Sequence, residues 1–155
     1  MELKNLIREY DVLQNKYKIP SFKEINDLFE LEKIDRDSNT LLRLVRKVMM
    51  EKVVNLMGLI DLFLAPNNVP RMYMPYLKSM TSEDRTALSN LYDKFSKLAL
   101  ECMSLEVEYN EKKEADMIIK ITKSWQESRV SLNSFFAQLQ KPEVREARKE
   151  KSYFG

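Results

Sequence analysis

Hydrophobic side chains recur along most of this chain with the spacing of amphipathic helices. Residues 3–18 place apolar side chains at i, i+3 and i+4, which puts them on one helix face. Pro20 follows and disfavours the helical conformation of the residue before it. Ser21 and Glu24 then have the spacing of a capping box. We therefore expect one helix over residues 3–18 and a short second helix that begins after Ser21.

A third helix is predicted to run to about Leu64, with Asp37, Ser38 or Asn39 as its N-terminal cap. Its first half is amphipathic, and its basic side chains fall opposite the apolar ones. Its second half is apolar nearly all round, which is typical of a central helix in a bundle. Gly58 lies inside this half, and we expect another helix to pack closely over it.

Two further helices are predicted between Ser82 and Gln140. Thr81 or Ser82 can cap the first of them. The apolar pattern breaks at residues 110–116 and then resumes. One continuous helix over this span would be about 90 Å long at 1.5 Å per residue, which is too long for so small a chain to cover. We therefore expect a turn near residues 110–113.

Composition supports the same fold class. The chain of 155 residues contains only two glycines, while sheet proteins and nucleotide-binding folds use glycine in turns and phosphate loops. The predicted fold is all-α, a four- to five-helix bundle with long central helices and a loop rich in proline and methionine. Residues 1–140 are expected to form a single domain, and residues 141–155 a charged C-terminal tail or short helix.

The absence of several residue types limits the chemistry. The sequence has no histidine, one cysteine and two isolated glycines. These numbers argue against imidazole-based catalysis, common zinc sites and phosphate-binding loops. We therefore predict no catalytic residue, no metal site and no cofactor, although an enzyme that uses carboxylates or lysine stays open. The acidic residues between Glu101 and Asp116 are interpreted as a solvated surface, and Cys102 as a core residue.

The expected location is cytoplasmic. One cysteine suits a reducing compartment, and Met1–Asn5 leads directly into an amphipathic pattern instead of a signal peptide. The most apolar run, Val53–Ala65, is too short to span a membrane and contains Asn55 and Asp61. The net charge of +2 indicates no strong attraction to nucleic acid or membranes.

The loop at residues 66–80 is the strongest candidate for function. A connection of this length is usually functional or disordered, and disordered connections are polar, whereas this one is not. It can fold back as a lid on the core, or it can form a docking surface, because Met adapts to irregular partners and Tyr and Arg are favoured at interfaces. The docking hypothesis fails if Met72, Tyr73 and Met74 are all fully buried. The predicted contact residues are Arg71, Met72, Tyr73, Met74 and Tyr76.

Two other segments carry weaker hypotheses. The segment Arg36–Lys52 contains five basic and two acidic residues, so Arg43, Arg46 and Lys47 can contact phosphates if they lie on an open helix face. The tail ends in Tyr153 and Phe154, which can anchor in a partner pocket. The alternatives are an ordinary solvated face and a dispensable tail.

These features favour a non-catalytic helical interaction protein, an adaptor, regulator or complex subunit that docks a protein partner through the 66–80 loop and its C-terminal tail. The alternative is an RNA- or ribosome-associated protein that uses the basic face of Arg36–Lys52. Pairing of the loop with a second copy, giving a homo-oligomer, is also open.

Overall fold

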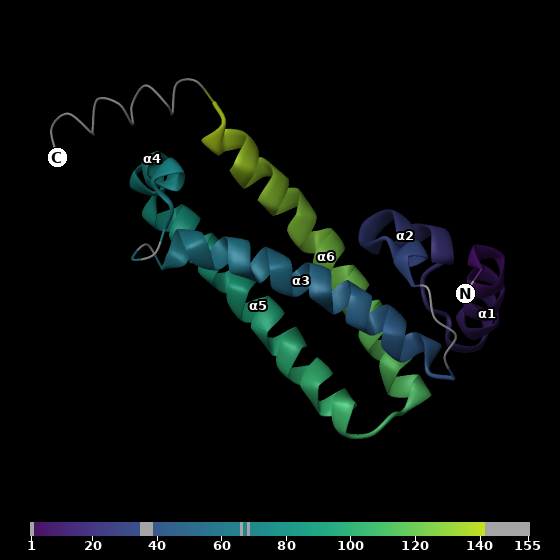
Figure 1. The fold of residues 1–155 in the computed structure, drawn as a ribbon. Helices are drawn as coiled ribbons and strands as arrows, with labels where there is room; N and C mark the ends of the chain where they lie inside the picture. The colour runs from purple at the N-terminus through teal and green to yellow at the C-terminus, as the bar shows by residue number, and fades with distance from the viewer. Residues whose placement is uncertain (1, 35–38, 66, 68, 142–155) are drawn as a thin grey trace, which may run out of the picture. The chain divides into compact units, whose positions relative to one another are not determined.

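The computed structural model describes residues 2–34, 39–65, 67 and 69–141. Figure 1 shows that this part of the chain is helical and that it contains no strand. The prediction of an all-α fold is confirmed. The α-helices are α1 (Leu3–Tyr17), α2 (Phe22–Phe29), α3 (Leu41–Leu64), α4 (Met74–Ser79), α5 (Ser82–Val107) and α6 (Glu111–Leu139), with short 3₁₀ helices η1 (Leu31–Lys33) and η3 (Arg71–Tyr73).

Side-chain caps explain where two of the helices begin. The Ser21 hydroxyl accepts a hydrogen bond from the backbone N–H of Glu24 at 3.2 Å, as the sequence predicts. Thr81 and Asp84 bond reciprocally at the start of α5. The Thr81 hydroxyl accepts from the Asp84 N–H at 3.1 Å, and the Asp84 carboxylate accepts from the Thr81 N–H at 2.9 Å. Asp37 and Ser38, two of the predicted caps of α3, lie outside the described residues.

The turn between the two longest helices lies slightly earlier than predicted. Helix α5 ends at Val107 and α6 begins at Glu111, so the break lies over residues 108–110 instead of 110–113. The Asn110 side chain accepts a hydrogen bond from the Lys113 N–H at 3.0 Å. Asparagine is a preferred N-cap, so the first residue of the predicted turn is the cap of the next helix.

The chain divides into two compact units. Unit 1 contains residues 1–54 and 97–125, and unit 2 contains residues 55–96 and 126–155. Helices α3, α5 and α6 each contribute residues to both units. The single domain predicted over residues 1–140 stays a prediction.

Unit 1 has a core of aliphatic side chains and two aromatic contacts. The rings of Tyr10 and Phe22 meet edge to face with centroids 5.5 Å apart, and the Tyr10 hydroxyl donates to the Pro20 carbonyl at 2.8 Å. The Phe29 and Trp125 rings lie 5.4 Å apart. Aliphatic core residues include Leu6, Ile25, Leu31, Leu42, Val45, Met49, Val53, Ile118 and Ile121.

Unit 2 has a core built around one aromatic side chain. Phe63 lies with its ring centroid 6.0 Å from that of Phe135 and 6.2 Å from those of Phe136 and Tyr73. All three pairs meet edge to face, the arrangement that aromatic quadrupoles favour. The buried residues of this cluster are Ile60, Phe63, Leu77, Met80, Leu88, Leu132 and Leu139.

Two predictions about individual core residues have opposite outcomes. Cys102 is buried, in agreement with its place on the apolar stripe. The expectation for Gly58 is wrong, because a Cβ atom built on this residue meets no heavy atom within 4 Å. Close helix packing therefore does not explain a glycine at this position.

Candidate functional site

The predicted loop contains regular structure. Residues 71–73 form η3 and residues 74–79 form α4, and Pro75 lies in the first turn of α4. Proline suits this position because the first turn of a helix needs no N–H from it. Pro66 and Asn68 lie outside the described residues. The segment of residues 69–80 is therefore a short helical connection between α3 and α5.

One side of this segment is anchored in the core of unit 2. Leu77 and Met80 are buried in the aromatic cluster, and Tyr73 packs against Phe63. The Arg85 guanidinium on α5 also donates to the Leu77 carbonyl at 3.4 Å. Apolar burial and this bond hold the short helix, which has too few residues to be stable alone.

The other side of the segment faces solvent. Met72 is 69% exposed and Met74 is 37% exposed, and Arg71 is exposed beside them. Tyr73 and Tyr76 are half-buried and pack against the core cluster. The condition that would have excluded docking, full burial of Met72, Tyr73 and Met74, is not met. We call the exposed set of Arg71, Met72 and Met74 the methionine surface.

The charged side chains within residues 69–80 have one sign. Arg71 and Lys78 are both exposed, and residues 69–80 contain no acidic residue. Lys78 lies in the last turn of α4. The segment therefore combines exposed apolar side chains with a local positive charge.

The predicted phosphate-contacting residues do not all lie on an open helix face, as the prediction required. Arg46 is only 2% exposed, so it does not lie on an open helix face. Its guanidinium contacts the Glu114 carboxylate at 2.5 Å and the Glu106 carboxylate at 2.6 Å. Lys47 is exposed and also pairs with Glu106, at 3.1 Å. Arg43 is half-buried.

Arg43 belongs to the same polar cluster in unit 1. It donates to the Leu105 carbonyl at 2.7 Å and to the Glu114 carboxylate at 3.3 Å. Its guanidinium also lies 5.2 Å from the centroid of the Tyr109 ring. The arginines of the predicted basic face thus bind groups of this chain, which leaves them poorly placed for phosphates.

Ion pairing sets the electrostatics of this cluster. Burial by itself lowers the pKa of Arg46, but the hydrogen bonds that Arg46 donates to Glu114 and Glu106 outweigh burial and raise the pKa above its usual range. The bond from Arg46 lowers the pKa of Glu106. Burial raises the pKa of the Cys102 thiol, which disfavours the reactive thiolate. The pairing therefore favours the charged forms of Arg46 and Glu106, and the cluster joins residues of α3, α5 and α6.

The interpretation of the acidic run as a solvated surface is wrong for Glu114, which is fully buried. The sequence contained a sign of this, since Glu114 lies four residues before Ile118 and seven before Ile121, on the same helix face. Arg46 likewise lies four residues after Leu42 and three before Met49, on one helix face. A charged residue in phase with an apolar stripe indicates a buried partner of opposite charge.

The remaining expectations from the sequence concern metals, membranes and the C-terminal tail. Within the described residues, no group of three or more His, Cys, Asp or Glu side chains is arranged to hold a metal ion. Among those same residues, no helix has the length and apolar character needed to cross a membrane. Tyr153 and Phe154, the predicted contact residues of the tail, lie outside the described residues.

The methionine surface is thus the candidate site that the sequence and the structure both leave open. Comparison of this chain with protein-family models, with curated proteins and with solved structures finds no match.

Proposed function

We propose that this chain is a non-catalytic helical interaction protein that docks a protein partner through the methionine surface. One observation carries the proposal. Met72 is 69% exposed, although its segment is anchored in the core by Leu77 and Met80. A flexible polar loop would need no such anchor, and a lid would turn its large apolar side chains inward.

The anchor has a consequence for binding. Ordering a mobile loop on association opposes binding by lost conformational entropy. Residues 71–79 are already folded as η3 and α4, so they lose less conformational entropy on binding. Met72 and Met74 add polarizable side chains that adapt to irregular partner surfaces.

The charge pattern selects the kind of partner. Arg71 and Lys78 favour acidic groups, and the two methionines favour apolar ones. A partner helix with leucine or phenylalanine on one face and acidic residues at its margins combines both. We therefore propose an acidic amphipathic segment as the partner.

This proposal includes the finer points of the fold. It treats residues 1–140 as one four- to five-helix bundle in the cytoplasm, with the proline- and methionine-rich segment presented at one place on the surface. Self-pairing of the methionine surface is the competing arrangement. It predicts a molecular mass that rises with concentration in light scattering and falls back in a Met72→Glu variant.

The test compares two methionines of similar exposure. Met72→Glu changes the methionine surface, and Met103→Glu makes the same change on α5, where Met103 is 66% exposed. Tagged wild-type and variant chains are used to isolate proteins from the source cells, with nuclease and at moderate salt. A protein retained by the wild type and by Met103→Glu is then purified, and its affinity for each chain is measured by calorimetry.

We expect Met72→Glu to weaken that affinity at least tenfold, because it places a carboxylate against an acidic partner. Arg71→Glu should weaken it further and should reduce its dependence on salt. Equal affinity of the wild type and Met72→Glu, or an equal loss of affinity in Met72→Glu and Met103→Glu, would contradict the proposal.

No observation favours the alternative of RNA contact through Arg36–Lys52, because Arg43, Arg46 and Lys47 pair with carboxylates or a carbonyl of this chain. The same isolation without nuclease tests it. Co-purified RNA that salt releases from the wild type, and that does not co-purify with a Lys47→Glu variant, would favour this alternative.

A further inference from the structure

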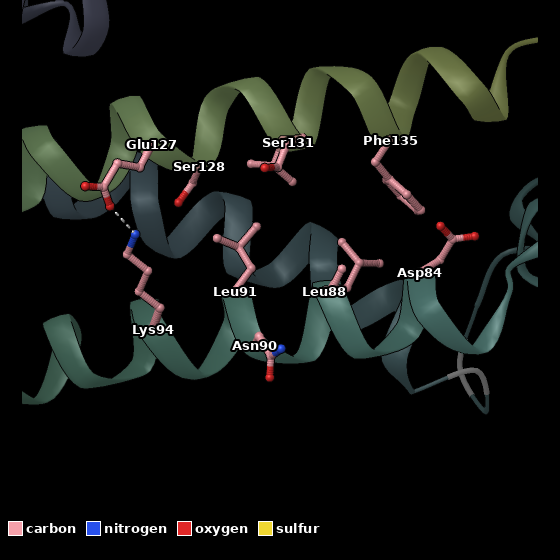
Figure 2. A pocket seen from close by; sticks show the side chains of 11 residues that line it. Asp84, Leu88, Asn90, Leu91, Lys94, Glu127, Ser128, Ser131 and Phe135 are labelled. Carbon is pink, nitrogen blue, oxygen red and sulfur yellow. Dashed lines mark hydrogen bonds and ion pairs between the residues drawn. The ribbon is translucent and has the colours of Figure 1, made fainter.

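Unit 2 contains a groove between α5 and α6 with a volume of about 280 Å³. Figure 2 shows its side chains reaching toward one another from the two helices. Leu88 and Leu132 form its buried floor, and half-buried Leu91 and Phe135 line its walls. Apolar lining with a few polar groups is the usual character of a small-molecule site.

One polar side chain of this groove is buried without a partner. Ser128 of α6 is only 5% exposed, and no hydrogen bond joins its hydroxyl to any residue that the structure describes. Thr122, another buried hydroxyl residue of the same helix, donates to the Ile118 carbonyl at 2.8 Å. Figure 2 shows the Ser128 hydroxyl pointing from α6 toward α5. Because a buried hydroxyl without a hydrogen bond is unfavourable, a ligand that bonds to Ser128 gains affinity.

The charged side chains that line the groove are already paired or bonded. At one end Lys94 and Glu127 pair at 2.8 Å. At the other end the Asp84 carboxylate accepts a hydrogen bond from a backbone N–H at 2.9 Å, and its neighbours Glu83 and Arg85 carry opposite charges. Moving a charged ligand out of water is unfavourable unless the site supplies an opposite charge to pair with it. The groove therefore favours a neutral ligand.

The volume of the groove limits the size of that ligand. A cavity of about 150 Å³ lined by leucine, isoleucine and phenylalanine takes one benzene molecule. At about 280 Å³, the groove has room for one aromatic ring with a short substituent. Phe135 on its wall supplies a ring against which an aromatic ligand packs edge to face or offset.

We propose that the groove between α5 and α6 binds a small neutral aromatic molecule that carries one hydroxyl group. The ring lies over Leu88 and Leu132, between Leu91 and Phe135. The ligand hydroxyl bonds to Ser128, because both groups can donate and accept a hydrogen bond. This site is separate from the methionine surface and does not depend on the function proposed for it.

The test compares two probes that differ by one hydroxyl, 4-ethylphenol and ethylbenzene. Each probe is titrated into the isotope-labelled full chain, and the shifts of the backbone amides in NMR spectra give both the affinity and the place of binding. We expect saturable binding of both probes, with the largest shifts in residues 84–94 of α5 and 127–135 of α6.

A matched pair of variants isolates the role of the buried hydroxyl. Ser128→Ala removes it, and Ser124→Ala makes the same change one turn earlier on α6, where Ser124 is also buried but lies outside the lining of the groove. Ser128→Ala should weaken binding of 4-ethylphenol by about fivefold or more, and binding of ethylbenzene by less than about twofold. Ser124→Ala should leave both affinities unchanged.

The same variant has a second readout, on stability. Since alanine removes a buried hydroxyl that has no partner, Ser128→Ala should not lower the melting temperature of the chain without ligand. Added 4-ethylphenol should raise the melting temperature of the wild type more than that of Ser128→Ala, because a ligand stabilises the folded chain in proportion to how tightly it binds.

A filled groove should bind neither probe. Ser131→Phe places a ring in the groove from an exposed lining position, and Ser134→Phe makes the same change at an exposed position of α6 outside the lining. Ser131→Phe should abolish binding of both probes, and Ser134→Phe should leave it unchanged. Asn90→Phe, on the α5 side, repeats the block if the first variant fails to fold.

Four results would overturn the proposal. These are the absence of saturable shifts at millimolar 4-ethylphenol, largest shifts outside residues 84–94 and 127–135, an unchanged affinity for 4-ethylphenol in Ser128→Ala, and a lower melting temperature of Ser128→Ala, which would show that the hydroxyl has a partner inside the protein. Met72→Glu should not change the affinity for 4-ethylphenol. Failure of this site and failure of the methionine surface are therefore distinguishable.

Discussion

The two compact units bury different kinds of side chain. Unit 1 encloses a charged pair, Arg46 and Glu114, which are 2% and 0% exposed. Unit 2 encloses an aromatic cluster around Phe63. Among the described residues of unit 2, the buried polar side chain is that of Ser128. A buried charged pair requires a particular geometry, whereas an apolar core tolerates substitution of one hydrophobic side chain by another of similar volume.

This difference indicates a division of roles. In unit 1 the basic and acidic side chains at the ends of α3, α5 and α6 bind one another. In unit 2 the core is apolar, and the methionine surface belongs to this unit. The surface proposed to bind a partner is thus found where buried charges do not restrict packing.

The largest expected effect tests the core of unit 2. Phe63→Ala should lower the free energy of unfolding by about 4 kcal/mol, because it removes a buried ring and three aromatic contacts. Urea denaturation followed by circular dichroism measures the change. Met103→Ala, an exposed control, should change the free energy by less than about 0.5 kcal/mol. A loss below about 1 kcal/mol for Phe63→Ala would contradict its central place in the core.

The next effect tests the core of unit 1. Glu114→Ala should lower the free energy of unfolding by about 3 kcal/mol, because it leaves the buried Arg46 guanidinium without its closest partner. The double change of Arg46→Met with Glu114→Leu should recover most of this loss, since it removes both charges. The same urea titration compares the two. A double variant no more stable than Glu114→Ala would show that packing, and not the unpaired charge, causes the loss.

A smaller effect, an increase in the free energy of unfolding, is expected at Gly58. Gly58→Ala should raise the free energy of unfolding by about 1 kcal/mol, since alanine favours the helix and its Cβ meets nothing within 4 Å. Thermal denaturation detects the rise. A decrease would mean that another part of the chain approaches Gly58 closely.

The smallest effect concerns the exposed margin of the charged cluster. The pKa of Glu106 is lowered in the folded chain by its bonds to Arg46 and Lys47, so its contribution is present above its usual pKa of 4.5 and is lost as the pH falls through the folded value. Glu106 is 43% exposed, which limits the contribution to less than about 1 kcal/mol. Stability measured between pH 7 and pH 3 should therefore fall less steeply in Glu106→Gln than in the wild type.

Glu108→Gln is the control for this pH series, because Glu108 is exposed two residues farther along the chain, in the turn after α5. An equal change of slope in both variants would show that the net charge of the chain, and not the pairs of Glu106, sets the pH dependence.

Several features were predictable because they depend on nearby residues. Periodicity placed the long helices, and the Ser21 and Thr81 side chains cap backbone N–H groups three residues away. The short helix within the 66–80 loop was not predicted, because three prolines and its small size conceal its helical pattern. The exposure of Met72 was likewise not predictable, since the sequence allowed both a lid and a docking surface.

The sequence by itself determined that this chain is helical and roughly where its long helices begin and end, because helix propensity, caps and apolar period act within a few turns. Only the tertiary structure decided which charges are buried. Arg46 and Glu114 are 68 residues apart in the chain and meet at 2.5 Å. It also decided which apolar side chains remain exposed, because the exposure of a side chain depends on what the rest of the chain packs against it.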